Sequence, residues 1–298
     1  MRPATSITVA GVLLALSLPA AAAAQAPAPG AMSVRVDGLH HVGHDDVVLR
    51  GDRVRVRGVL APYVAGQHVA VRAYRGRKRV ALKTLAVRPV AGTPNGGFAV
   101  SLRLPRGQIT IRAVHRASPA QATAAAKPRR LLVIAAQTHP GASGPTVRLL
   151  QSRLSALHYA VGRSGVFDAS TARAVIAYRK VTGRARLASA PRSLLHALLA
   201  GRGAFHARHP EHGKHVEVDL SRQVMALLRG GRVDRIYGVS SGKPSTPTVL
   251  GRFRVYSQTP GTNSLGMVDT SYFIGAYGIH GYASVPTFPA SHGCDRRR

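Results

Sequence analysis

The spacing of apolar residues changes twice along this chain, and this limits the possible folds more than any other feature of the sequence. Over residues 33–136, apolar side chains alternate with polar ones in short runs that end at Gly and Pro turns, as from Arg53 to Val56. A period of two residues indicates strands, and many short strands favour an all-β sandwich. We expect this sandwich to be antiparallel and to act as a spacer or binding module, because it gathers no catalytic residue types.

A helical period follows the Gly-containing segment 138–144. Pro145 suits the first turn of a helix, and either Asp168 or Ser170 can cap a second helix. A later leucine-rich stretch predicts a third helix. The sequence therefore predicts a small all-α three-helix module over 145–201. The apolar residues on the face of its first helix are Val147, Leu150, Leu154 and Leu157.

Strand-like alternation returns after the helices, from His215 onward. Val216, Val218 and Leu220 show it first, and we expect a further strand to begin within 251–255. The region 214–298 is therefore predicted to be a β-rich domain.

Four histidines recur at every third residue just before that domain, at 206, 209, 212 and 215. On a short helix this spacing can bind a metal ion. Pro210 and Gly213 interrupt the series, so a solvated linker is the favoured interpretation. We predict no metal and no cofactor.

The first residues have the order of a secretory signal peptide. Arg2 supplies a positive start, 7–18 is a short apolar run, and 20–24 offers small residues for cleavage after Ala24. The alternative is an uncleaved membrane anchor, although the run falls short of the roughly 20 residues of a span. We expect a signal peptide over 1–24, export to the cell envelope, periplasm or cell wall, and no membrane span after signal removal.

The chain is strongly basic, with 42 Lys and Arg residues against 11 acidic ones and a net charge of +31. A basic chain can bind nucleic acid. The export signal and the scarcity of aromatic residues between the basic ones argue against nucleic acid here. An anionic wall or membrane surface is the expected partner, and a solvated surface without a partner is the alternative.

Cys294 is the single cysteine of the sequence and cannot form an internal disulfide. It follows Ser291, His292 and Gly293, whereas inert buried cysteines sit among apolar residues. A cysteine nucleophile needs a base that favours the thiolate and donors for the oxyanion of the attacked carbonyl. His280 lies upstream on a segment that can fold back onto the thiol, and Gly293 permits a sharp turn.

Two families are similar to parts of this sequence. The stretch 145–201 resembles the three-helix peptidoglycan-binding domain, and 214–296 resembles the L,D-transpeptidase family with its YkuD-type catalytic domain. The residues that carry the resemblances are Val147, Leu150-Gln151 and Gly165-Val-Phe-Asp-Ala-Ser-Thr171 for the first, and Val239-Ser-Ser-Gly-Lys243, Thr248-Val-Leu-Gly251, Ile279-His-Gly281 and Ser291-His-Gly-Cys294 for the second.

The transpeptidase resemblance implies a cysteine acyl-transfer enzyme that crosslinks peptidoglycan stem peptides through a thioester on Cys294. It implies His280 as the base, oriented by a backbone carbonyl near Gly281. Ser291, His292 and Gly293 would shape the oxyanion site, and Arg296 would support the loop or meet a substrate carboxylate. Glycan strands and stem peptides would bind to the helical module.

The sequence departs from the family pattern at three points: Val249 replaces a proline, Asp295 replaces an apolar residue, and the sequence ends four residues after Cys294. We expect a catalytic domain that is incomplete at its C-terminus and poorly active, with Asp295 disfavouring the thiolate. Two other functions stay open. One is a non-catalytic wall-binding protein with a decayed enzyme domain, and the other is a cysteine peptidase or amidase that transfers the acyl group to water.

Overall fold

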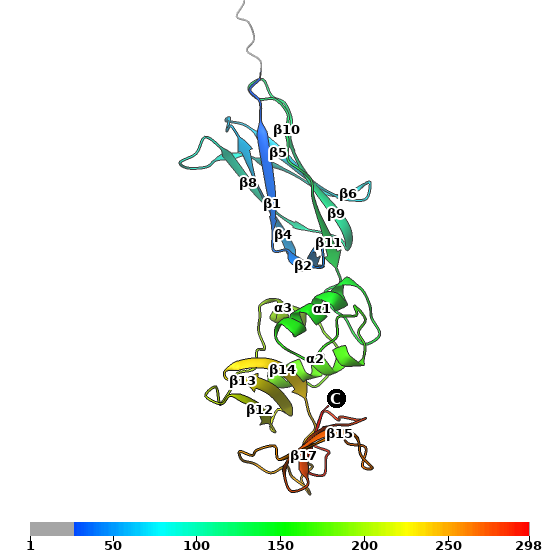
Figure 1. Ribbon diagram of the computed structural model, residues 1–298. Helices are drawn as coiled ribbons and strands as arrows, with labels where there is room; N and C mark the ends of the chain where they lie inside the picture. The colour runs from blue at the N-terminus through cyan, green and yellow to red at the C-terminus, as the bar shows by residue number, and fades with distance from the viewer. Residues whose placement is uncertain (1–26, 298) are drawn as a thin grey trace, which may run out of the picture.

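A computed structural model describes residues 27–297, with side chains up to Asp295. Three parts follow one another along the long axis of the molecule: a β sandwich, a group of helices, and a β-rich C-terminal part (Figure 1). The predicted fold class is therefore confirmed, whereas the expected signal peptide over 1–24 lies outside the described residues. Over the described residues, no helix combines the length and the apolar character that a membrane crossing requires.

Two sheets form the sandwich. The first has the strand order β1-β4-β8-β7, and the second has the order β2-β3-β11-β9-β5-β6, with β10 paired to β9. The strands of the first sheet are β1 (Ala31–Asp37), β4 (Arg53–Ala61), β7 (Arg88–Pro89) and β8 (Gly96–Arg103). Those of the second are β2 (His40–Val42), β3 (Asp45–Leu49), β5 (His68–Arg75), β6 (Lys78–Ala86), β9 (Gly107–His115), β10 (Ala124–Ala125) and β11 (Arg129–Ile134).

The alternation in the sequence sets which side chains face the sandwich core. In β4, Val54 and Val56 are buried, while Arg53 and Arg55 between them are exposed. Successive side chains of a strand point to opposite faces, so the valines pack inward and the guanidinium groups reach water. This arrangement also explains how so basic a sequence builds an apolar core.

One strand pair differs from the expected antiparallel arrangement. β11 runs parallel to β3, with Val133 beside Val48. A parallel pair needs a long connection between its strands, and here most of the sandwich lies between them. The amide of Arg50 donates to the carbonyl of Ile134 at 2.8 Å, so both strand ends lead toward the helices.

The helical part consists of α1 (Pro145–Ala156), α2 (Ala169–Val181) and α3 (Arg192–Leu199). Asp168 is the N-cap of α2, because its carboxylate accepts from the Thr171 amide at 2.8 Å, which decides between the two predicted caps. The buried Gln151 of α1 donates to Val166 O and accepts from Gly165 N, at 2.9 and 2.8 Å. The glycine-rich turn before α2 is therefore fixed by one amide side chain.

The helices share a continuous apolar core with both neighbouring parts. Leu49 of the sandwich and Ala226 and Ile236 of the C-terminal part belong to the same buried cluster as the helices. The Ala160 amide donates to Ile236 O at 3.0 Å, and the Ile236 amide donates to His158 O at 2.8 Å. The helical part is therefore docked against the β-rich part by a core and by backbone hydrogen bonds.

The C-terminal part contains two sheets, ordered β12-β13-β14 and β15-β16-β17-β18. Their strands are β12 (Lys214–Asp219), β13 (Val224–Arg229), β14 (Arg232–Gly238), β15 (Ser257–Thr262), β16 (Val268–Ile274), β17 (Tyr277–Gly281) and β18 (Asp295–Arg297). The prediction of a strand beginning within 251–255 was wrong, because regular pairing starts at Ser257, opposite Tyr272.

The last sheet buries little apolar surface. Among the described residues, the buried apolar side chains end at Val239, while Tyr256 and Leu265 of the last sheet region are 62% and 70% exposed. Its polar residues Thr270, His280 and Ser291 are buried instead. Specific hydrogen bonds, more than an apolar core, therefore position this sheet and the residues it carries.

Candidate active site

His280 and Cys294 come from neighbouring strands of the last sheet. β17 and β18 are parallel, and His280 pairs with Arg296. Cys294 lies immediately before β18, so the chain at Cys294 runs beside the strand that carries His280. The fold thus brings together two predicted site residues that lie on separate segments of the sequence.

The His280 ring is oriented by the next residue along the chain. Its Nδ1 lies 2.9 Å from the carbonyl oxygen of Gly281, and the residue is only 2% exposed. A carbonyl oxygen can only accept, so this bond requires the proton on Nδ1 and leaves the lone pair on Nε2. Tyr282 packs edge-on against the ring at 5.8 Å between centroids. The imidazole is thus held in the tautomer that a base requires.

Gly293 shapes the turn that presents Cys294. Its φ is +109°, and a Cβ at this position would lie 2.5 Å from the Tyr277 ring, so both backbone angle and space require glycine. The following Cys294 is half-buried, and its Sγ contacts the carbonyl of Ala276 at 3.5 Å. The loop of residues 291–294 therefore packs closely on the start of β17.

The segment after β14 holds this loop from the other side. The Ser291 amide donates to Ser241 O at 2.9 Å, and the Ser291 carbonyl accepts from the Lys243 amide at 2.9 Å. The Thr248 hydroxyl donates to Gly293 O at 2.8 Å and accepts from the Gly242 amide at 2.9 Å. Sequence reasoning quoted Thr248 only as part of a motif, and its place in the site follows from these two bonds.

A buried amide and a buried ammonium connect the same segment to the helices. Gln223 donates from Nε2 to the Ser241 hydroxyl at 2.6 Å and accepts at Oε1 from the Ser241 amide at 2.9 Å. Lys180 of α2 donates from Nζ to Gln223 O at 3.1 Å and to Val239 O at 2.8 Å. Sequence reasoning did not predict Gln223 as a site residue. It did not predict Lys180 either, because a lone lysine near a helix end usually remains solvated.

The other predicted site residues take different positions. His292 is exposed, and its Nε2 lies 3.4 Å from the Nζ of Lys243. Ser291 is buried, and its amide is already engaged by Ser241, so Ser291 holds the loop in place. The backbone of Arg296 pairs with His280, but its side chain lies outside the described part of the chain.

Comparisons with known proteins match two parts of the chain to families. Residues 213–296 match the family model of the L,D-transpeptidase catalytic domain, and 143–184 match that of a peptidoglycan binding domain. A crystallised L,D-transpeptidase from Xylanimonas cellulosilytica is 36% identical, over 54% of this chain and 86% of that chain, with a TM-score of 0.49. The chain belongs to the L,D-transpeptidase family.

A second solved L,D-transpeptidase shares less sequence identity with this chain. An Enterococcus faecium L,D-transpeptidase is 28% identical, over 35% of this chain and 53% of that chain, with a TM-score of 0.26. A comparison with curated proteins gave no match. The family assignment rests on the family models and on the sequence identity to the Xylanimonas enzyme.

Asp295 of this L,D-transpeptidase chain is buried, with 2% of its surface exposed. Its Oδ1 has no hydrogen-bond partner, and burial raises the pKa of the carboxyl to about 7. At pH 7 such a group carries only about half a negative charge. The repulsion that we expected between Asp295 and the Cys294 thiolate is therefore weakened below neutral pH.

Proposed function

We propose that this chain crosslinks peptidoglycan stem peptides through a thioester on Cys294. Nε2 of His280 accepts the thiol proton, and Sγ attacks the carbonyl carbon of the third stem residue. The tetrahedral intermediate collapses to the thioester as the bond to the terminal D-alanine breaks, and His280 returns the proton to the leaving amine. An amine of a neighbouring stem then attacks the thioester, forming an amide and restoring the thiol.

One observation supports this proposal: the pairing of β17 with β18 sets the chain at Cys294 beside the strand of His280, while the Gly281 carbonyl accepts from Nδ1 of the His280 ring. His280 is buried and His292 is exposed, which favours His280 as the base. A ring removed from water keeps one orientation, whereas an exposed ring samples several. In the oxyanion site, we assign Gly293 and Cys294 as amide donors and Ser291 as a support.

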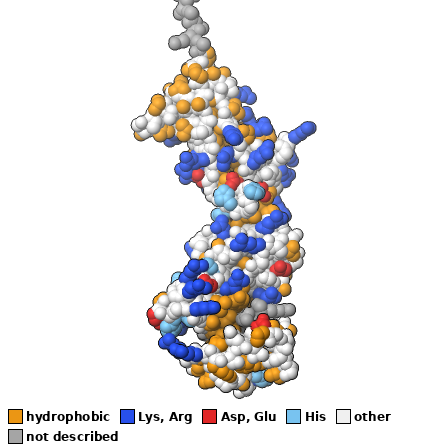
Figure 2. All heavy atoms as spheres, in the orientation of Figure 1, with side chains coloured by type: hydrophobic (Ala, Val, Ile, Leu, Met, Phe, Trp, Pro, Cys, Tyr) orange, Lys and Arg blue, Asp and Glu red, His pale blue; other side chains and the backbone are white. Residues whose placement is uncertain are grey.

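The helical module and the sandwich would hold the enzyme on its substrate. Figure 2 shows Lys and Arg side chains spread over the visible face of the molecule, with few acidic ones between them. Peptidoglycan stems carry carboxylates, so a diffuse basic surface attracts them by charge alone, without a specific binding site. We propose that the exported protein acts at the cell wall, with residues 33–136 as a spacer, the helices as the wall-binding part and no nucleic-acid partner.

The test uses the full chain with a disaccharide-tetrapeptide, and the products are identified by mass spectrometry. We expect a dimer whose mass equals two substrates less one alanine, and no dimer from the Cys294→Ala variant. Dimer formation by Cys294→Ala would refute the thioester on that residue. Release of alanine with only monomeric tripeptide would identify a peptidase, and unchanged substrate together with retained wall binding would identify a non-catalytic wall-binding protein.

A further inference from the structure

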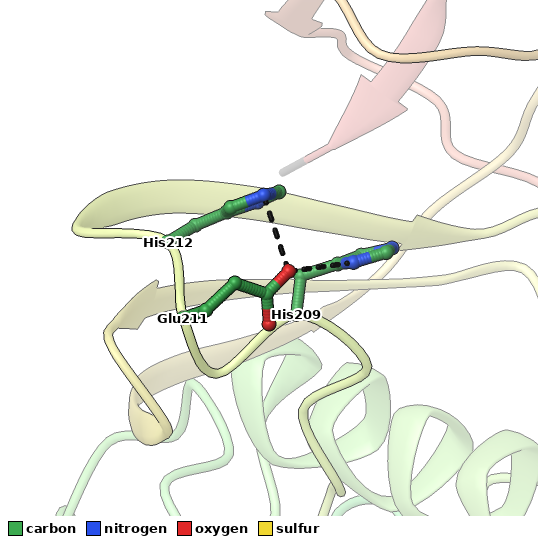
Figure 3. Close-up of side chains that lie close together, drawn as sticks. All are labelled: His209, Glu211 and His212. Atoms are coloured by element: carbon green, nitrogen blue, oxygen red, sulfur yellow. Dashed lines mark hydrogen bonds and ion pairs between the residues drawn. The ribbon is translucent and has the colours of Figure 1, made fainter.

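The linker between α3 and β12 gathers three possible metal ligands on its surface. Ligand atoms of His209, Glu211 and His212 all lie within 4.8 Å of one another (Figure 3). Sequence reasoning predicted no metal here, because Pro210 interrupts a helix. The structure forms a turn instead of a helix, closed by the His212 amide donating to His209 O at 3.1 Å.

The separations between these atoms fit a tetrahedral ion. His209 Nδ1 lies 3.2 Å and His212 Nε2 lies 3.3 Å from the same Glu211 oxygen, Oε1. Four ligands around Zn²⁺ at about 2.0–2.1 Å stand about 3.3 Å apart along each edge of the tetrahedron. Two of the three ligand pairs already have the spacing that Zn²⁺ requires, while the two imidazole rings stack at 5.0 Å between centroids, so binding would need the two nitrogens to move closer together.

Glu217 of β12 fixes the backbone that carries His209. Its carboxylate accepts from the Arg208 amide at 2.9 Å and from the His209 amide at 2.8 Å. It also contacts His215 Nε2 at 3.2 Å, and His215 packs edge-on against His212 at 5.4 Å between centroids. Both His215 and Glu217 are therefore engaged in holding the turn, while His209 and Glu211 are exposed and His212 is partly exposed.

The charge around the turn also differs from that of the rest of the chain. Four of the 11 acidic residues fall between 211 and 234, namely Glu211, Glu217, Asp219 and Asp234. Lys214, Arg222, Arg229 and Arg232 equal them in number, so this segment has no net charge with His counted as neutral. A cation therefore meets less repulsion here than elsewhere on so basic a molecule.

We propose that His209, Glu211 and His212 bind one Zn²⁺ ion, with water as the fourth ligand. Two imidazoles and one carboxylate suit a borderline divalent transition ion better than Mg²⁺ or Ca²⁺, which prefer oxygen ligands alone. The ion joins residues on both sides of Pro210 and stiffens the connection between the helices and β12. This role for the ion is structural and assigns it no step in acyl transfer at Cys294.

Isothermal titration of ZnCl₂ into the full chain tests this site. The protein carries no polyhistidine tag and contains Cys294→Ala, so that the thiol cannot contribute. We expect one ion per chain, with affinity falling by about tenfold or more in His209→Gln and in His212→Gln. His206→Gln is the matched control, since His206 is an exposed linker histidine outside the cluster, and it should bind Zn²⁺ unchanged.

Thermal unfolding gives a second measurement on the same proteins. Zn²⁺ should raise the Tm of the parent and of His206→Gln but not that of the His209→Gln, His212→Gln double variant. Mg²⁺ at the same concentration should leave the Tm of all three proteins unchanged. No Zn²⁺ binding by the parent, or equal binding by the parent and the double variant, would overturn the proposal.

Discussion

Lys180, near the end of α2, donates from Nζ to the carbonyl oxygen of Val239 at 2.8 Å, across the boundary between the helices and the β-rich part. Val239 directly precedes Ser240 and Ser241, and Ser241 accepts from the Ser291 amide. Hydrogen bonds therefore connect a helix of the peptidoglycan binding domain to the loop of the proposed nucleophile. Burial, with a smaller contribution from Arg186, lowers the pKa of Lys180 from 10.5 to about 7.

The first prediction concerns the pH dependence of stability. Between about pH 7 and pH 10, the unfolded chain binds a proton at Lys180 that the folded chain lacks, so this group makes the folded state more stable as pH rises. Lys180→Met should remove this rise of stability with pH. We expect the Tm of the parent, relative to the variant, to increase from about pH 7 to about pH 9.5. The exposed Lys214→Met is the control, and an equal slope in all three proteins would contradict the prediction.

The second prediction concerns the base. His280→Ala should slow acylation of Cys294 by a carbapenem about 10²–10⁴-fold, because the thiol loses its proton acceptor. The reaction is followed by intact-protein mass spectrometry. His292→Ala should have a smaller effect, since that ring is exposed, and His206→Ala in the linker should have none. A crippled His292→Ala with an active His280→Ala would assign the base to His292.

The third prediction separates backbone strain from close packing. Gly293 and Gly275 both have positive φ, +109° and +46°, but only Gly293 lies against a ring, that of Tyr277. Gly293→Ala should displace Tyr277 and the cysteine loop, and slow acylation by about tenfold or more. Gly275→Ala should keep the parent rate, because nothing lies within 4 Å of the added carbon. Equal rates in the two variants would show that the turn tolerates a side chain.

The fourth prediction concerns Asp295, whose pKa is raised from 3.8 to about 7. Between these values the folded chain holds a proton that the unfolded chain releases, so the buried carboxyl lowers stability as pH rises toward 7. Asp295→Asn should be more stable than the parent above about pH 7, with the difference shrinking toward about pH 4. Thermal unfolding across that range measures it. A difference that does not depend on pH would exclude titration of Asp295 as the cause.

Local patterns in the sequence predict the elements of this fold because their causes are local. The alternation in β4 and the Asp168 cap of α2 each depend on residues a few positions apart. Cys294 and His280 could be singled out because few residue types perform nucleophilic catalysis, although the strand register that relates them could not be predicted.

Other features depend on contacts between distant segments. Lys180 donates to carbonyl groups 43 and 59 residues further along the chain, and no spacing in the sequence indicates that these groups meet. Thr248 likewise contacts the cysteine loop by donating to the carbonyl oxygen of Gly293, 45 residues further on. The non-helical linker was predicted from Pro210, but the approach of His209, Glu211 and His212 was not, because it depends on Glu217 of the next strand holding the His209 amide.

The bond between His280 Nδ1 and Gly281 O has a kinetic consequence for the proposed enzyme. Only Nε2 is left to exchange protons, so the proton taken from the thiol and the proton of the incoming amine must use the same nitrogen in succession. The departing D-alanine and the acceptor amine therefore occupy the same position by turns and cannot be bound there together. The enzyme should follow ping-pong kinetics, in which free D-alanine competes with the acceptor for the thioester.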